Sequence, residues 1–101
     1  MAENRRMLAE EESYRALAAA MLLQTVVDLH APAGRTREIR AERIANRYSA
    51  MRFLSSSWFG EICDSLDIHP RRARVWLLDR ETYRRLKLRR RGRKSTGFWV
   101  A

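Results

Sequence analysis

Apolar residues recur at spacings of three and four along most of the chain, which is the pattern of amphipathic helices. No stretch alternates apolar and polar residues as a half-buried strand would. Four of the six prolines and glycines lie near residues 32–34 and 92–97, and the stretches between are rich in good helix formers. The pattern therefore predicts an all-α fold, a small helical bundle of four to five helices.

The first predicted helix covers about residues 6–30. Its expected core stripe consists of Tyr14, Leu17, Met21 and Thr25, widened by Leu22, Val26 and Leu29. The segment Ala16–Ala20 has mostly small side chains, which permit close helix packing. A core helix is the favoured interpretation, and a role in a homodimer interface stays open.

A second helix is predicted over about residues 37–54, with Thr36 as its N-cap. The expected core stripe consists of Ile39, Ile44, Tyr48, Met51 and Leu54. The outer face carries arginines at spacings of three and four, namely Arg37, Arg40, Arg43 and Arg47. We expect this row to be solvated beside Glu38 and Glu42, with contact to phosphate as the alternative.

The segment at about residues 58–78 has the pattern of two short helices joined by a tight turn. Its expected inward face consists of Phe59, Ile62, Cys63, Leu66, Ile68, Ala73, Trp76 and Leu77. Pro70 fits the first turn of the second short helix, where its missing N–H costs nothing. This arrangement leaves Arg71, Arg72, Arg74 and Val75 facing outward.

The turn and its flanks have plausible local roles. Asp67 stands at a position that commonly needs a positive φ, which Asp tolerates better than most residues. His69 is expected to cap the next helix or to approach a phosphate. One serine of Ser55–Ser57 is expected to be an N-cap, and a nucleophilic serine is disfavoured because no catalytic setting surrounds it. Cys63 is interpreted as a small buried residue.

Charge is distributed very unevenly. The net charge is +9, but residues 1–69 hold 9 Lys+Arg and 10 Asp+Glu, a net of −1, whereas residues 70–101 hold 12 and 2, a net of +10. A near-neutral body with a basic end favours a polyanionic partner, with nucleic acid ahead of an anionic membrane. The tail residues expected to contact phosphate are Arg84, Arg85, Lys87, Arg89, Arg90, Arg91, Arg93 and Lys94. A solvated basic end is the plainer alternative.

The segment 58–78 resembles the bacterial helix-turn-helix. The matching residues are Ile62, Cys63, Leu66, Ile68, Trp76 and Leu77. A wider stretch, residues 13–90, resembles phage-derived bacterial regulators, including the DNA-binding part of gene transfer agent activators, on Trp58, Phe59, Ile62, Cys63, Leu66, Ile68, Pro70 and Arg74. The resemblance implies a protein that binds a promoter and helps to recruit RNA polymerase, often with a partner subunit.

The residues predict a sequence-specific DNA-binding transcription regulator, and the resemblance implies an activator of phage-like or gene-transfer-agent genes that helps to recruit RNA polymerase. The recognition residues would be His69, Arg71, Arg72, Arg74 and Val75, because the N-terminal part of a recognition helix lies in the major groove of double-stranded DNA. The alternative is an RNA-polymerase-binding or antitermination adaptor whose basic tail contacts RNA.

Other expectations concern organisation and chemistry. We expect a helical DNA-binding domain over residues 1–91 and a basic and aromatic tail over 92–101, whose Phe98 and Trp99 dock on the core or on a partner. The single cysteine excludes an intramolecular disulfide. No catalytic or metal-binding set is recognisable, so neither an enzyme nor a cofactor is expected. With no signal peptide or membrane span in the pattern, we expect a cytoplasmic, nucleoid-associated protein.

Overall fold

The computed structural model describes residues 2–89, with side chains from residue 9 onward. This part of the chain is all-helical, as the sequence predicts. Its elements are α1 (Ala2–His30), α2 (Arg37–Leu54), α3 (Ser57–Ser65), α4 (Pro70–Leu78) and a further helical segment over residues 80–89. The predicted helix boundaries agree closely, except that α1 begins four residues earlier than expected.

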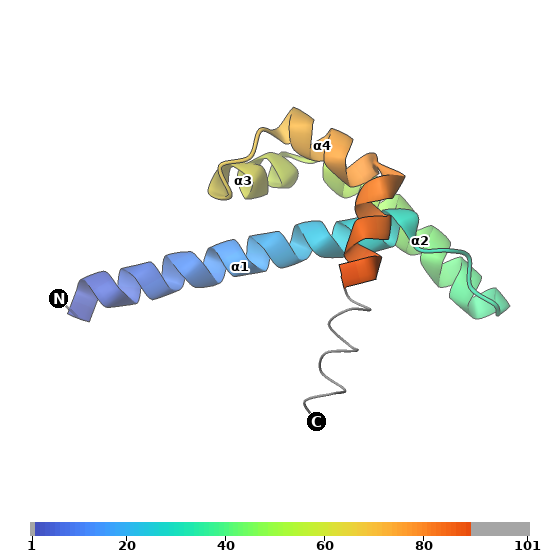
Figure 1. Ribbon diagram of the computed structural model, residues 1–101, viewed down its shortest axis with the longest axis horizontal. Helices are drawn as coiled ribbons and strands as arrows, with labels where there is room; N and C mark the ends of the chain where they lie inside the picture. The colour runs from blue at the N-terminus through green and yellow to red at the C-terminus, as the bar shows by residue number, and fades with distance from the viewer. Residues whose placement is uncertain (1, 90–101) are drawn as a thin grey trace, which may run out of the picture.

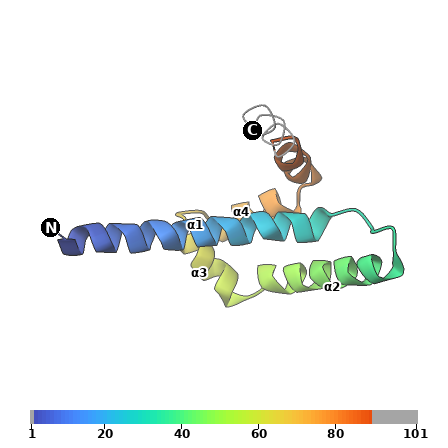
Figure 2. The same ribbon diagram turned by 90° about the horizontal axis from the view of Figure 1, so that it is seen from below.

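Helix α1 is the element against which the others pack. Helix α2 returns antiparallel to it after the loop at residues 31–36, and α3 and α4 lie along another side (Figure 1; Figure 2). The helical segment 80–89 crosses the C-terminal part of α1 (Figure 1). The N-terminal half of α1 extends well beyond the other helices in both views.

Local interactions fix the loop between α1 and α2. The Thr36 side chain accepts a hydrogen bond from the Ile39 amide at 3.2 Å, so it is the N-cap that the sequence predicts. The Arg43 guanidinium donates to the Pro32 carbonyl and holds the loop against the helix. Gly34 is required here by space, because an added Cβ would clash with the side chain of Ile39.

One apolar core joins the four labelled helices. It consists of Ala18, Leu22, Val26, Leu29, Ala50, Leu54, Phe59, Ile62, Cys63, Ala73 and Leu77. On α1 the expected stripe is only partly correct: Leu22, Val26 and Leu29 are buried, but Tyr14 and Leu17 are exposed. The buried stripe instead begins at Ala18, because the other helices meet α1 only from that point onward.

The predicted core stripe of α2 is largely wrong. Ile44, Tyr48 and Met51 are exposed, with Ile44 at 70% and Tyr48 at 67%, and Ile39 is only partly covered. The buried residues of α2 are Ala50 and Leu54, near its C-terminal end. Burial is concentrated there because α3 follows directly and shares that end of the core, where Phe53 meets Phe59 edge-on with 5.5 Å between ring centroids.

Candidate nucleic-acid interface

Helices α3 and α4 form the two-helix unit that the sequence predicts. Ser56 is the N-cap of α3, and its hydroxyl accepts a hydrogen bond from the Phe59 amide at 3.3 Å. Phe59, Ile62 and Cys63 are fully buried on one side of α3, and Ala73 and Leu77 are buried on the facing side of α4. The first helix therefore braces the second through a continuous apolar contact.

The turn between the helices is built around Asp67. Its φ of 55° places it in the left-handed region, as expected from the sequence. The Ile68 amide donates to the Cys63 carbonyl at 2.9 Å, and the Asp67 amide donates to the Asp64 carbonyl at 3.1 Å. This pair of bonds is a Schellman motif, which satisfies the last carbonyls of α3. Arg15 of α1 forms an ion pair with Asp67 at 3.1 Å and ties the turn to the body.

The N-terminus of α4 begins at a capped and pre-shaped position. The Nδ1 atom of His69 accepts a hydrogen bond from the Arg71 amide at 3.2 Å, so His69 is an N-cap. Pro70 occupies the first helical turn, as predicted. The start of α4 is thus held in one geometry, and the direction of the side chains that follow is fixed with it.

The exposed face of α4 carries Arg71, Arg72 and Val75. Both arginines are exposed, and Val75 is 68% exposed. Among the described residues, neither guanidinium takes part in a salt bridge or a side-chain hydrogen bond. These three side chains are therefore available to an external ligand.

Arg74 does not share that face, and the expectation that it points outward is wrong. Its Nε donates to the Leu54 carbonyl at 2.9 Å, and its guanidinium lies over the Phe59 ring at 5.2 Å from the centroid. The side chain therefore joins the end of α2 to both helices of the unit. Arg74 therefore has a structural role. Helix α2 ends at Leu54, within reach of the Arg74 guanidinium, so this side chain binds a carbonyl at the C-terminal end of α2.

Trp76 and Ile68 also depart from their expected inward positions. Trp76 is 46% exposed and Ile68 is 38% exposed. Helix α4 is only nine residues long, and its core contacts are made by Ala73 and Leu77, which leaves the indole at the edge. The helical segment 80–89 passes beside it and turns that edge into a groove.

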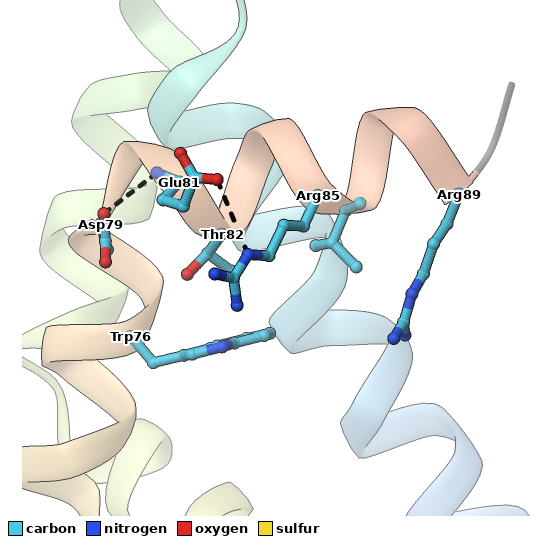
Figure 3. Close-up of a pocket in the computed structure, with 7 residues that line it drawn as sticks. Trp76, Asp79, Glu81, Thr82, Arg85 and Arg89 are labelled. Atoms are coloured by element: carbon cyan, nitrogen blue, oxygen red, sulfur yellow. Dashed lines mark hydrogen bonds and ion pairs between the residues drawn. The ribbon is translucent and has the colours of Figure 1, made fainter.

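The groove has a volume of about 280 Å³. It is lined by Trp76, Asp79, Glu81, Thr82, Arg85, Leu86 and Arg89. Figure 3 shows the flat indole of Trp76 on one side, with Arg85 and Arg89 projecting from the helical segment toward the same space. The groove also contains the carboxylates of Asp79 and Glu81, and Glu81 pairs with Arg85, so the contact that it offers most directly to a nucleic acid is stacking of a base or sugar on the indole.

The helical segment 80–89, which we call the basic segment, packs on α1. His30 stacks on Tyr83 with 6.0 Å between ring centroids, its Nε2 lies 2.7 Å from the Leu77 carbonyl oxygen, and Thr82 is buried. The sequence gives no sign of this role for His30, because its stacking partner lies 53 residues further along. These contacts fix the position of the helix that carries the basic side chains.

The predicted tail contacts are distributed over this segment. Arg84 and Arg85 are exposed and each lies 3.6 Å from a Glu81 carboxylate oxygen, and the Lys87 ammonium lies 6.0 Å from the Tyr83 ring centroid. Arg89 lines the groove. The other predicted contacts lie outside the described residues, as do Phe98 and Trp99; those contacts are Arg90, Arg91, Arg93 and Lys94.

The groove beside Trp76 is not among the features predicted from the sequence. A signal was present, because Trp76 lies one helical turn after Arg72 and so follows the outward arginine along the helix. The resemblance to the helix-turn-helix pattern instead placed this tryptophan in the core. Arg85 and Arg89 have the same spacing of four and fall on one face of their own helix.

Cys63 has no features of a reactive thiol. It is fully buried, and this burial raises the pKa of the thiol, an effect that Arg74 opposes and Asp64 adds to. The described part of the chain contains no group of three or more His, Cys, Asp or Glu side chains that could hold a metal ion. Among the same residues, none of the helices has the length and apolar character needed to cross a membrane.

Comparison of the chain with protein-family models, curated proteins and solved structures finds no match. The two-helix unit and the surfaces beside it are therefore the features that bear on function.

Proposed function

We propose that this protein is a sequence-specific DNA-binding protein that uses α3 and α4 as a helix-turn-helix. The observation that carries the proposal is the division of α4 into two faces. One face is buried by Ala73 and Leu77, and the other presents Arg71, Arg72 and Val75 without partners among the described residues. A short, braced helix with outward arginines near its N-terminus is what a major groove accommodates.

Each exposed side chain has a chemically defined use. Arg71 and Arg72 can donate bidentately to guanine O6 and N7, and Val75 can contact a thymine methyl group. A good bidentate pair contributes about 1–3 kcal/mol of discrimination between bases. Arg74 is excluded from this set, because its guanidinium is used inside the protein.

The basic segment supplies affinity that does not depend on sequence. Arg84, Arg85, Lys87 and Arg89 stand on one short helix, and the excess positive charge of the chain begins at α4. If about five phosphates are neutralised, the logarithm of the binding constant falls against the logarithm of salt concentration with a slope near −4.5. Trp76 lies on α4 with Arg71 and Arg72 and lines the groove with Arg85 and Arg89. It would therefore contact the sugar-phosphate backbone of the DNA between these two pairs of arginines.

The proposal is tested by selecting target sites from random duplexes and measuring affinities by fluorescence anisotropy. We expect the wild-type protein to enrich a defined site, and Arg72→Ala to lose the preference at one position. Arg35→Ala is the matched control, since this exposed arginine lies in the loop after α1. Equal affinities for the selected and scrambled duplexes at moderate salt would refute the proposal.

The finer proposal is that the protein is a transcription activator of phage-like genes that helps to recruit RNA polymerase. It rests on the resemblance of residues 13–90 to phage-derived regulators. Transcription in vitro from a template bearing the selected site, with the host RNA polymerase, tests it. Stimulation that is lost in Arg72→Ala supports activation, whereas a decrease in transcript would indicate a repressor.

A second candidate is an adaptor that binds RNA through its basic segment. The groove beside Trp76 favours it, since an indole next to Arg85 and Arg89 can stack on an unpaired base. Competition between single-stranded RNA and the selected duplex separates the two candidates. Tighter binding of RNA, lost in Trp76→Leu but not in Arg72→Ala, would favour the adaptor.

A further inference from the structure

Among the residues whose side chains the structure describes, the part of α1 before Ala18 buries none, and Arg15 reaches the turn at Asp67 from it. The helix has 29 residues and is about 43 Å long at 1.5 Å per residue. Its buried residues begin only at Ala18, and the part before them extends away from the other helices (Figure 1; Figure 2). Tyr14 and Leu17 lie on this extension and are exposed, with Leu17 at 60%. In proteins most of the stability of a helix comes from covering its apolar face rather than from helix propensity.

One face of this extension is both acidic and apolar. Glu10, Tyr14, Leu17 and Met21 follow one another at spacings of four, three and four, so they form one row, which we call the α1 strip. Glu10, Tyr14 and Leu17 are exposed, and Met21 is partly covered. Glu11 and Glu12 follow Glu10 and add negative charge to the same turn.

Helix α2 has an uncovered face of the opposite charge. Arg40, Ile44, Tyr48 and Met51 follow one another at spacings of four, four and three, and we call this row the α2 strip. All four side chains are exposed. Arg37 and Arg47 are also exposed and lie on the same side of the helix by their spacing from this row. Single exposed apolar residues are common on protein surfaces, but three large ones in one row form a contiguous patch of the kind found at interaction sites.

We propose that the two strips are the two halves of one interface, and that a second copy of this chain covers them. Each strip has one charged residue followed along the chain by three apolar residues, and the two charges are opposite in sign. With the helices parallel, Glu10 of one copy lies beside Arg40 of the other, Tyr14 beside Ile44, Leu17 beside Tyr48, and Met21 beside Met51. The antiparallel alignment would place Glu10 beside Met51 and leave Arg40 opposite apolar residues. Charge complementarity therefore selects the parallel alignment.

This alignment closes a symmetric dimer. Within one chain α2 runs back along α1, antiparallel in Figure 2 and inclined to it in Figure 1, so an α1 that is parallel to the second copy's α2 runs broadly opposite to the second copy's α1. A two-fold axis perpendicular to the helices produces that relation and forms the contact twice. The dimer does not depend on DNA binding, because no residue of either strip lies on α3 or α4.

Sedimentation velocity of the full chain over a range of concentrations tests the dimer. We expect the wild-type protein to reach a mass of twice 11.9 kDa at micromolar concentration. Leu17→Glu and Tyr48→Glu should each weaken association by at least about tenfold, because each places a carboxylate in an apolar contact. Leu88→Glu is the control, since Leu88 is similarly exposed but lies on the helical segment 80–89. Circular dichroism checks that each variant remains helical.

A charge-reversal pair tests the alignment. Glu10→Arg and Arg40→Glu should each weaken association at low salt, by about two- to fivefold per ion pair, and the double variant should recover it. A wild-type protein that stays monomeric at about 100 µM, or a Tyr48→Glu variant that associates as tightly as the wild type, would overturn the proposal. So would assemblies that grow beyond two copies, or a double variant without recovery.

Discussion

Helices α2 and α4 are built from the same kinds of residue but are covered very differently. Each buries one alanine and one leucine a single turn apart, Ala50 and Leu54 in α2 and Ala73 and Leu77 in α4. In α4 these two positions span most of a nine-residue helix, so its orientation is fixed along its length. In α2 they lie at one end of an 18-residue helix, and the larger apolar residues before them remain exposed.

The difference teaches that the buried face is marked by small residues as much as by large ones. Helix α1 repeats the pattern, with Ala18 and Leu22 buried while Tyr14 and Leu17 are exposed. Alanine allows two helix backbones to approach closely, and the leucine one turn later fills the space beyond it. Large apolar side chains at helical spacing identify a helix without showing which side of it is covered.

The largest expected effect comes from breaking the buried face of α4. Leu77 is fully buried, so Leu77→Ala should lower the free energy of unfolding by about 2–5 kcal/mol. The neighbouring Leu78 is exposed, and Leu78→Ala should change it by less than about 0.5 kcal/mol. Urea unfolding followed by circular dichroism measures both. Similar losses in the two variants would show that α4 is not oriented as described.

Much of the fold could be predicted from the sequence. The helix positions, Thr36 and Pro70 at helix starts, and the positive φ of Asp67 all follow from local chemistry, which the sequence carries directly. The covering of α2 and the position of Trp76 could not be predicted, because both depend on where a distant helix passes. For the candidate site, Arg71, Arg72 and Val75 are exposed as expected, but Arg74 is diverted by the Leu54 carbonyl, which is 20 residues away.

The second prediction contrasts two arginines on α4. Arg74→Ala should lower the free energy of unfolding by about 1.5–3 kcal/mol, because it removes a hydrogen bond from a charged donor and a contact with the Phe59 ring. Arg72→Ala should leave stability within about 0.5 kcal/mol of the wild type. Thermal and urea unfolding of the two variants provides the comparison. Equal stabilities would mean that Arg74 does not hold α2 to the helix-turn-helix.

For DNA binding we expect the opposite order, with the larger loss of affinity in Arg72→Ala. Under conditions where both are folded, Arg72→Ala should weaken binding to the selected site by about 1–3 kcal/mol, and Arg74→Ala should have little effect. Anisotropy titrations with the selected and scrambled duplexes measure this. A specific loss in Arg74→Ala would instead show that this side chain leaves its internal contacts to reach a base.

The third prediction uses Cys63 to probe the buried side of α3 as a function of pH. Burial raises the pKa of the folded thiol above its ordinary value of 9.0, so the unfolded chain loses the proton first as the pH rises. The stabilisation is therefore fully present below about pH 9 and declines above it, by up to about 1.4 kcal/mol per pH unit. Cys63→Ala removes this dependence, so the stability difference between wild type and variant should shrink between pH 8 and pH 10. A constant difference would mean that the thiol is accessible to water.

The smallest effect is expected on the uncovered face of α2. Ile44→Ala should change the free energy of unfolding by less than about 0.5 kcal/mol in dilute protein, because the side chain contacts mainly solvent. Leu54→Ala on the same helix should cost about 2–5 kcal/mol and serves as the control. At high protein concentration the wild type should gain stability over Ile44→Ala, because association favours the folded state. A loss in Ile44→Ala that is already large in dilute protein would place Ile44 in the core and remove the contrast between α2 and α4.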